Sequence, residues 1–243
     1  MFCREKASTR EDAWPRWLIT RFPISSSACI DAERGGRKLG NWPTAKPKLQ
    51  VKWLCPSCNN GWMSRLENEA KPVLESILDD KLKDIDASAQ STLARWAVKT
   101  AMVLEAIDSN RPWFYSEAER QLMRAAISLP QRTSVWVAKC VNQPNIYCAA
   151  IDHRTAPGDD RVYAFVTTMA FGSLALQVVS IKTPAAIPEN VAVTYDVSEG
   201  PWEHTLVQVW PTSQNSRAWP PFNGLAGELG LDVLTERLSS ATR

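Results

Sequence analysis

Three cysteines near the start of the chain are the residues with the clearest capacity for chemistry. Cys55 and Cys58 are separated by two residues, a spacing that lets a tight turn place both sulfurs on one metal ion. Thiolate sulfur is a soft ligand that suits tetrahedral zinc, and Cys3 supplies a third candidate. The sequence therefore predicts a structural Zn²⁺ site held by Cys3, Cys55 and Cys58. The alternative interpretation is a pair of small buried side chains in a turn.

The fourth ligand of such a site remains open. It is absent, or it is Cys29 folded back from the following segment, or it precedes Met1. The last source is favoured, because a Cys-x-x-Cys pair that ends at Cys3 would begin one residue upstream of Met1. Cys140 and Cys148 fall in a region of strand-like pattern, where we expect buried free thiols.

The charges are divided unevenly along the chain. Residues 1–71 carry 13 Lys/Arg and 7 Asp/Glu, whereas the remainder carries 15 and 19. A basic excess on the segment that holds the thiols favours a polyanionic partner, and we expect DNA. The phosphate-contacting residues would be Arg16, Arg21, Arg34, Arg37, Lys38, Lys46, Lys48 and Lys52. The alternative interpretation is an ordinary solvated face.

The sequence also indicates the cellular compartment and the cofactors to expect. Residues 2–6 are polar almost at once and show no signal segment, and six cysteines are too few for a disulfide scaffold. The apolar stretch from Tyr163 to Ile181 contains a central Gly172-Ser173, which favours two buried strands over a membrane helix. We therefore expect a cytoplasmic protein with no membrane partner. After residue 80 we find no phosphate loop, nucleophile elbow or dinucleotide fingerprint, so we expect no organic cofactor.

The thiols and acids must be positioned by elements that the pattern also predicts. A short helix is expected near Trp14–Ile19, a loop over residues 22–48, and a strand over Leu49–Leu54 that runs into the cysteine turn. A helix follows, capped by Asn59 or Asn60, and Pro72 must kink it or begin a second one.

The remainder of the chain changes from helical to strand periodicity. Helices are predicted near Ser88–Ile107 and Ser116–Ser128, the second opened by a capping box of Ser116 and Glu119. Strands and a last helix are predicted at Val135–Val137, Ile146–Ala150, Tyr163–Thr168, Ser173–Ile181, Thr205–Trp210 and, for the helix, Leu225–Leu238. The predicted fold class is α+β: a small zinc-bound module at residues 1–80, then a helical middle and a mostly antiparallel β region at residues 81–243.

Two segments resemble the HNH endonucleases, the ββα-metal nucleases. The first contains Glu11-Asp12 followed by Pro15, and the second runs from Trp53 to Trp62 through the cysteine turn. In that family a thiol pair precedes an acidic-His dipeptide and a proline. A second thiol pair then ends a strand, and Asn or His opens the next helix. The resemblance covers roughly residues 1–67.

The resemblance implies a role for each matching residue. Cys3, Cys55 and Cys58 correspond to structural zinc ligands. Glu11 corresponds to the acid that helps hold a catalytic divalent ion, Mg²⁺ or Mn²⁺, and Asn59 corresponds to the metal-binding position on the helix. Asp12 stands where the family has its general-base histidine, and residues 1–71 contain no histidine.

The departure at Asp12 matters because an aspartate, with an ordinary pKa of about 3.9, is a weaker base than an imidazole with a pKa of about 6.5. Each pKa unit corresponds to roughly 1.4 kcal/mol of proton affinity. Asp12 can instead join Glu11 as a metal ligand. His153 is the better of two distant histidines for the base, if the β region covers the module.

The expected function is a DNA-acting, metal-dependent phosphodiester endonuclease or a degenerate relative of one, with Asp12, Glu11 and Asn59 as its site. The alternative is an inactive zinc-stapled module that binds nucleic acid or protein. Glu11 and Asp12 then serve as the N-cap and a first-turn acid of the Trp14 helix, and Asn59 serves as a helix cap. Glu67 is expected to be a packing residue or to form an ion pair.

Overall fold

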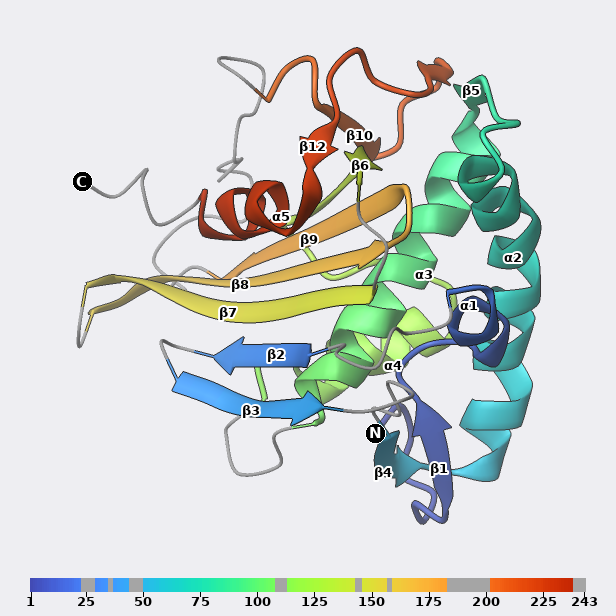
Figure 1. Cartoon of the computed structure of the whole chain (residues 1–243). Coiled ribbons are helices and arrows are strands. Elements are labelled where there is room, and N and C mark those ends of the chain that lie inside the picture. The colour runs from blue at the N-terminus through green and yellow to red at the C-terminus, as the bar shows by residue number, and fades with distance from the viewer. Residues whose placement is uncertain are drawn as a thin grey trace.

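The structure is a computed structural model that describes residues 1–22, 29–34, 37–43, 50–107, 113–142, 146–156, 159–182 and 202–237. Within 29–43 and 152–163 it describes the backbone alone. The architecture is α+β, as the sequence predicts, with helices on both faces of an antiparallel sheet (Figure 1).

The N-terminal part has the order strand, strand, helix. Strand β1 (Thr9–Asp12) pairs antiparallel with β4 (Gln50–Leu54), and α2 (Ser64–Leu78) follows the cysteine turn. The short helix α1 (Arg16–Arg21) leaves β1 directly and begins after Pro15, close to its expected position. The strand before the cysteines is therefore confirmed, and its antiparallel partner is the strand that carries the two acids.

The loop expected over residues 22–48 is wrong. Strands β2 (Cys29–Arg34) and β3 (Arg37–Pro43) form an antiparallel hairpin in this interval. Only two residues separate the strands, which is the length of a tight hairpin turn. The density of glycine and proline led to the loop assignment, although both residue types are also common where hairpins turn and end.

The entry to α2 also differs from the expectation. The chain over Cys58–Met63 kinks at Gly61, which has the non-helical φ of −97° and ψ of −108°, and the residue that precedes α2 is Met63, so neither Asn59 nor Asn60 caps the helix. The backbone N–H of Asn59 instead donates to the carbonyl of Cys55, at 3.0 Å. Pro72 lies inside α2, and no second helix begins there.

The helical middle agrees with the periodicity. Helix α3 (Ala87–Glu105) follows the short strand β5 (Asp84–Ile85), and the side chain of Asp86 caps it by accepting from the N–H of Ala89. Helix α4 (Glu117–Arg124) opens with the expected capping box of Ser116 and Glu119.

The second half of the chain forms a large sheet with strand order β10-β6-β9-β8-β7, and β12 joins β6 in parallel. Neighbours along that path are antiparallel. The bounds are β6 Thr133–Val141, β7 Ile146–Ala156, β8 Asp159–Phe171, β9 Leu174–Lys182, β10 Leu206–Trp210, β11 Arg217–Ala218, β12 Leu225–Ala226 and the final helix α5 Gly227–Glu236.

The apolar stretch Tyr163–Ile181 forms two buried strands, as predicted. Phe171 faces Leu174 across the β8–β9 turn, and Gly172 adopts a positive φ of +53° at this turn. Among the described helices, none combines the length and the apolar character that a membrane crossing requires.

The two faces of the large sheet are covered differently. One buried cluster joins the sheet to α3, α2 and the N-terminal module and extends from Phe2 to Trp219. A second, smaller cluster lies under α5 and includes Trp136 and Leu231. The residues before and after position 80 therefore share one hydrophobic core. Trp14 and Trp62 contribute to it, so these two tryptophans fill a core rather than face solvent.

Candidate metal centre and adjoining carboxylate site

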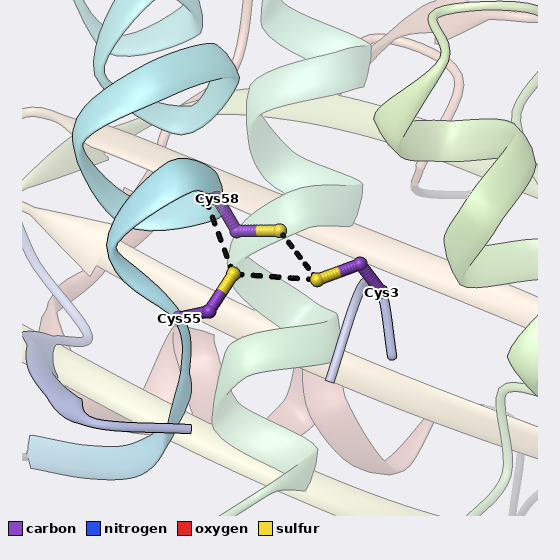
Figure 2. A group of neighbouring side chains, drawn as sticks. All are labelled: Cys3, Cys55 and Cys58. Carbon is purple, nitrogen blue, oxygen red and sulfur yellow. Dashed lines mark hydrogen bonds between the residues drawn. The ribbon is translucent and has the colours of Figure 1, made fainter. Parts of the chain in front are cut away.

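The three predicted thiols come together in the structure. The sulfur of Cys3 lies 3.3 Å from that of Cys55 and 3.5 Å from that of Cys58 (Figure 2). The ligand atoms of all three lie within 4.8 Å of one another, the sole cluster of at least three His, Cys, Asp or Glu ligands among the described residues. Figure 2 shows the three sulfurs pointing toward a common centre from two segments far apart in sequence.

The cluster could hold a metal ion. Sulfurs bound to one zinc at about 2.3 Å stand roughly 3.8 Å apart, so a small outward movement of the side chains would accommodate the ion. The local chain supports this arrangement, because the N–H of Cys58 points at the sulfur of Cys55 at 3.4 Å. The side chain of Cys29, one possible fourth ligand, lies outside the described residues.

The surroundings shift the pKa values of the Cys55 and Cys58 thiols in opposite directions. Burial raises the pKa of the Cys55 thiol, but hydrogen bonds with Ser57, the Cys58 backbone and the other two thiols outweigh it, so the pKa falls below its usual value. The pKa of the Cys58 thiol is raised to about 12, mainly because the thiol is buried and further because it forms hydrogen bonds with Cys3 and Cys55. Of these two thiols, Cys55 is therefore the closer to the thiolate form that metals bind. Hydrogen bonds from Ser57 and Cys55 also lower the pKa of Glu5.

A second site lies where β1 meets the start of α2. Glu11 of β1 faces Val51 of β4 in the strand register. The Asn59 side chain forms a hydrogen bond with the carboxyl group of Glu11. The Asn59 Nδ2 also donates to the carbonyl of Arg10, at 3.4 Å. The structure therefore brings together Glu11 and Asn59, the two residues that the sequence names as ligands of a catalytic cation.

The pKa of the Glu11 carboxyl is raised to about 7. Burial is the main cause of the increase, and the charges of Glu67 and Asp12 add to it. The positive charge of Lys99 and the hydrogen bond from Asn59 act in the opposite direction. A divalent cation would favour the ionised form of a partly buried carboxyl that lies among other acids.

Asp12 lies beside this site but is engaged elsewhere. Its Oδ1 accepts a hydrogen bond from the Gln50 side chain at 2.6 Å, and its Oδ2 lies 3.6 Å from the Arg16 guanidinium. The alternative role as N-cap and first-turn acid is wrong, because α1 begins at Arg16 after Pro15 and has no acid in its first turn, whereas Glu11 and Asp12 end β1. Asp12 acts instead as a structural acid that ties the end of β1 to Gln50 and Arg16.

Sequence reasoning missed Lys99. Its Nζ lies 3.0 Å from Glu67 Oε1, and its side chain is only 1% exposed. The ion pair expected of Glu67 is therefore confirmed, and its partner comes from α3 rather than from the module. A signal was present, since Lys99 is the single charged residue in the apolar run Trp96–Leu104. Lysine is almost never fully buried without a partner.

The other candidates are distributed over the surface and the core. Arg16 is 91% exposed and Lys52 is also exposed, whereas Arg21 pairs with Asp79. The side chains of Arg34, Arg37, Lys38, Lys46 and Lys48, and that of His153, lie outside the described residues. Cys140 and Cys148 are buried free thiols as expected, and burial raises the pKa of each to about 12.

Comparison with protein-family models, with curated proteins and with solved structures finds no match to this chain.

Proposed function

We propose that the protein is an HNH-like zinc protein of the reducing cytoplasm that acts on DNA as a metal-dependent phosphodiester endonuclease. The observation that carries the proposal is the contact between Glu11 and Asn59 beside the Cys3, Cys55 and Cys58 cluster. These residues are distant in sequence, and they are the ones that the HNH resemblance pairs. In this reading the thiols hold a structural Zn²⁺ that fixes the cysteine turn, and with it Asn59.

The carboxylate of Glu11 and the amide oxygen of Asn59 would hold the catalytic Mg²⁺ or Mn²⁺. Such an ion stabilises the charge that develops on a phosphate oxygen and on the leaving oxygen. Partial burial of Glu11 reduces the water around the carboxylate and strengthens its interaction with a cation. Asn59 is oriented by its bond to the Arg10 carbonyl, which keeps its side chain over β1.

Exposed basic residues flank this site. Arg16 follows β1 at the start of α1, and Lys52 lies on β4, the strand paired with β1. Cations at these positions suit the phosphates of a DNA backbone, and they make binding dependent on salt.

The test is nicking of supercoiled plasmid with Mg²⁺ or Mn²⁺ present. We expect Asn59→Ala and Glu11→Gln to reduce the nicking rate at least ~100-fold, because each removes a cation ligand. Asn60→Ala is the matched control, since Asn60 is adjacent and exposed, and it should retain the rate. Equal nicking by Asn59→Ala and by the unaltered protein would show that another site or a contaminant is responsible.

A second candidate function is favoured by the contacts of Asp12. Its bonds to Gln50 and Arg16 describe a structural acid rather than a base poised to activate water. The protein would then be a zinc-stapled module that binds DNA or protein without cleaving it. In that case DNA binding survives Asn59→Ala, falls with added salt, and is lost when zinc is chelated.

A further inference from the structure

The segment that carries Cys3 has little secondary structure to hold it. The first strand begins at Thr9, whereas Cys55 follows β4 directly and Cys58 begins the turn into α2. The position of the Cys3 sulfur therefore depends on tertiary contacts made by its neighbours.

Those neighbours are held on both sides of Cys3 by the region around α4. The Nε of Arg120 donates to the carbonyl of Met1 at 3.2 Å, and the Nε of Arg4 lies 3.1 Å from Glu117 Oε1. Between them Phe2 is completely buried, and its ring packs edge-on against Trp62 with centroids 4.9 Å apart. The Arg4 pair is exposed, as is the hydrogen bond from the Met1 ammonium to the Trp53 carbonyl at 2.9 Å, whereas the bond from Arg120 is partly buried, so Arg120 is the stronger polar tether.

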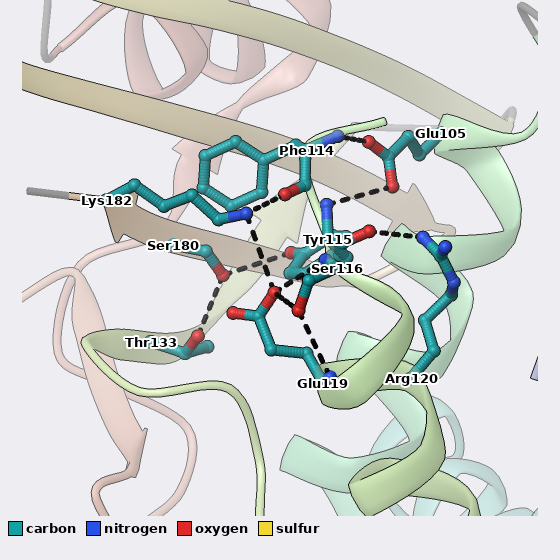
Figure 3. Close-up of polar contacts among 9 residues, drawn as sticks. All are labelled: Glu105, Phe114, Tyr115, Ser116, Glu119, Arg120, Thr133, Ser180 and Lys182. Carbon is teal, nitrogen blue, oxygen red and sulfur yellow. Dashed lines mark hydrogen bonds and ion pairs between the residues drawn. The ribbon is translucent and has the colours of Figure 1, made fainter. Parts of the chain in front are cut away.

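Arg120 is itself firmly placed. Its guanidinium is largely buried, lies 4.1 Å from the centroid of the Trp113 ring, and donates through Nη1 to the carbonyl of Tyr115. Figure 3 shows this contact within a polar network that reaches α3 and the sheet. The Tyr115 backbone N–H donates to Glu105 of α3, and its hydroxyl lies 3.0 Å from Ser180 Oγ of β9.

We propose that Arg120 is a positioning residue for the thiol cluster: by holding Met1, it places the Cys3 sulfur against Cys55 and Cys58. The inference rests on the proposed zinc site and deepens it, because it makes metal affinity depend on a helix outside the residues that bind the metal. A third thiolate already in place avoids the cost of ordering a mobile ligand when the ion binds. Groups that hydrogen-bond directly to a metal ligand typically change metal affinity by about 10–100-fold, and we take this range for Arg120, which acts through Met1.

The first measurement needs no metal. The reduced, metal-free protein is alkylated with iodoacetamide, and the rate at each cysteine is followed by mass spectrometry. We expect Arg120→Ala to accelerate labelling of Cys3 relative to Cys55 and Cys58. Arg217→Ala is the control, since Arg217 is an exposed arginine of β11, outside the N-terminal module, and it should leave the labelling pattern unchanged.

The second measurement is titration with Co²⁺, whose thiolate charge-transfer absorption reports the number of bound sulfurs. For Arg120→Ala we expect affinity to fall about 10–100-fold. Absorption per bound ion should fall towards the value for two thiolates. Arg120→Lys retains the positive charge but loses the planar guanidinium group with its several hydrogen-bond donors, so we expect an intermediate affinity for Co²⁺. Far-UV circular dichroism establishes that each variant is folded.

The outcomes separate this inference from the metal site itself. Wild-type labelling and wild-type cobalt absorption in a folded Arg120→Ala protein would overturn the role of Arg120. If Arg120→Ala does not fold, Arg120→Lys decides by the same two measurements, and unchanged Cys3 labelling overturns the inference. Failure of the unaltered protein to bind cobalt or zinc would instead overturn the zinc site. The alkylation rates would still test whether Arg120 positions Cys3.

Discussion

At the scale of single residues, Asp12 limits what the carboxylate site can do. It stands beside Glu11 and bonds to Gln50, and an aspartate is a weak base at neutral pH. An imidazole at this position would have a pKa near the working pH, where a general base is most effective.

We therefore expect Asp12→His to increase plasmid nicking in Mg²⁺ by at least ~10-fold over the unaltered protein, a small part of the usual gain from a general base. The double variant Asp12→His, Asn59→Ala should lose this gain, which ties it to the same site. A lower rate in Asp12→His would mean that Asp12 already performs a necessary role, such as holding the cation.

The ion pair of Lys99 and Glu67 gives a second prediction at this scale. Lys99 is buried, so replacing it with methionine leaves Glu67 without its 3.0 Å partner beside Glu11. Loss of one member of a buried pair costs about 3 kcal/mol. We expect Lys99→Met to lower the free energy of unfolding in urea by about that amount.

Glu67→Gln supplies the other single variant, and Lys99→Met, Glu67→Gln completes a double-mutant cycle. The double variant should be more stable than Lys99→Met alone, because it removes the unpaired carboxylate. A Lys99→Met protein within about 0.5 kcal/mol of the unaltered one would contradict the importance of the pair.

At the scale of elements, α1 is tied to the end of α2 by charge. Arg21 ends α1 and pairs with Asp79, the C-cap of α2, whose Oδ2 also lies 2.9 Å from Lys81 Nζ. Hydrogen bonds from Arg21 and then Lys81 hold the pKa of Asp79 below its ordinary value of 3.8.

The sign of the pH effect follows from this shift. The folded state binds the proton of Asp79 less tightly than the unfolded chain, so the pairs add stability above pH 3.8 and lose it as the pH falls through the folded pKa. We expect Asp79→Asn to melt at a lower temperature than the unaltered protein near pH 7, and the difference to close in acid. Asp84→Asn controls for loss of a surface charge. A gap that widens in acid would contradict the assignment.

The turn between β8 and β9 depends on glycine. Gly172 has a φ of +53°, and an added Cβ would lie 2.4 Å from an atom of the Phe22 ring. We expect Gly172→Ala to lower the free energy of unfolding by about 2–4 kcal/mol, from backbone strain and overpacking together. Ser173→Ala, at the next position of the same turn, should change it little. Equal stability of these two variants in chemical denaturation would contradict the argument.

At the scale of the whole molecule, the metal module does not have a core of its own. Trp14, which follows the acids of β1, is buried and packs edge-on against Phe171 of β8, with ring centroids 5.2 Å apart. Glu67 depends on α3, and Met1 depends on Arg120 of α4. The sequence-based division at residue 80 therefore separates elements whose buried surfaces meet.

We expect a fragment of residues 1–80 to show no cooperative thermal unfolding, even with zinc present, because its apolar face would remain exposed to water. The full chain with zinc is the control, and both are followed by circular dichroism. A fragment that melts cooperatively would show that metal and local contacts suffice, as they do in isolated zinc fingers.

The sequence by itself determined the features that depend on neighbours along the chain. Spacing identified the cysteine pair, helical periodicity located α3 and α4, and the Gly172-Ser173 interruption divided an apolar run into β8 and β9. The pairing of Glu11 with Asn59, which are distant in sequence, was instead an expectation from the resemblance to HNH endonucleases.

Only the tertiary structure decided which distant residues complete the sites. Lys99 lies against Glu67, Arg120 donates to the carbonyl of Met1, and Asp12 accepts from Gln50, all across long sequence separations. The local sequence pattern indicates which residues are buried and where the chain turns. The strength of an ion pair and the position of a thiol depend instead on which surfaces pack together. That packing is a property of the shared core, and no single segment of the sequence specifies it.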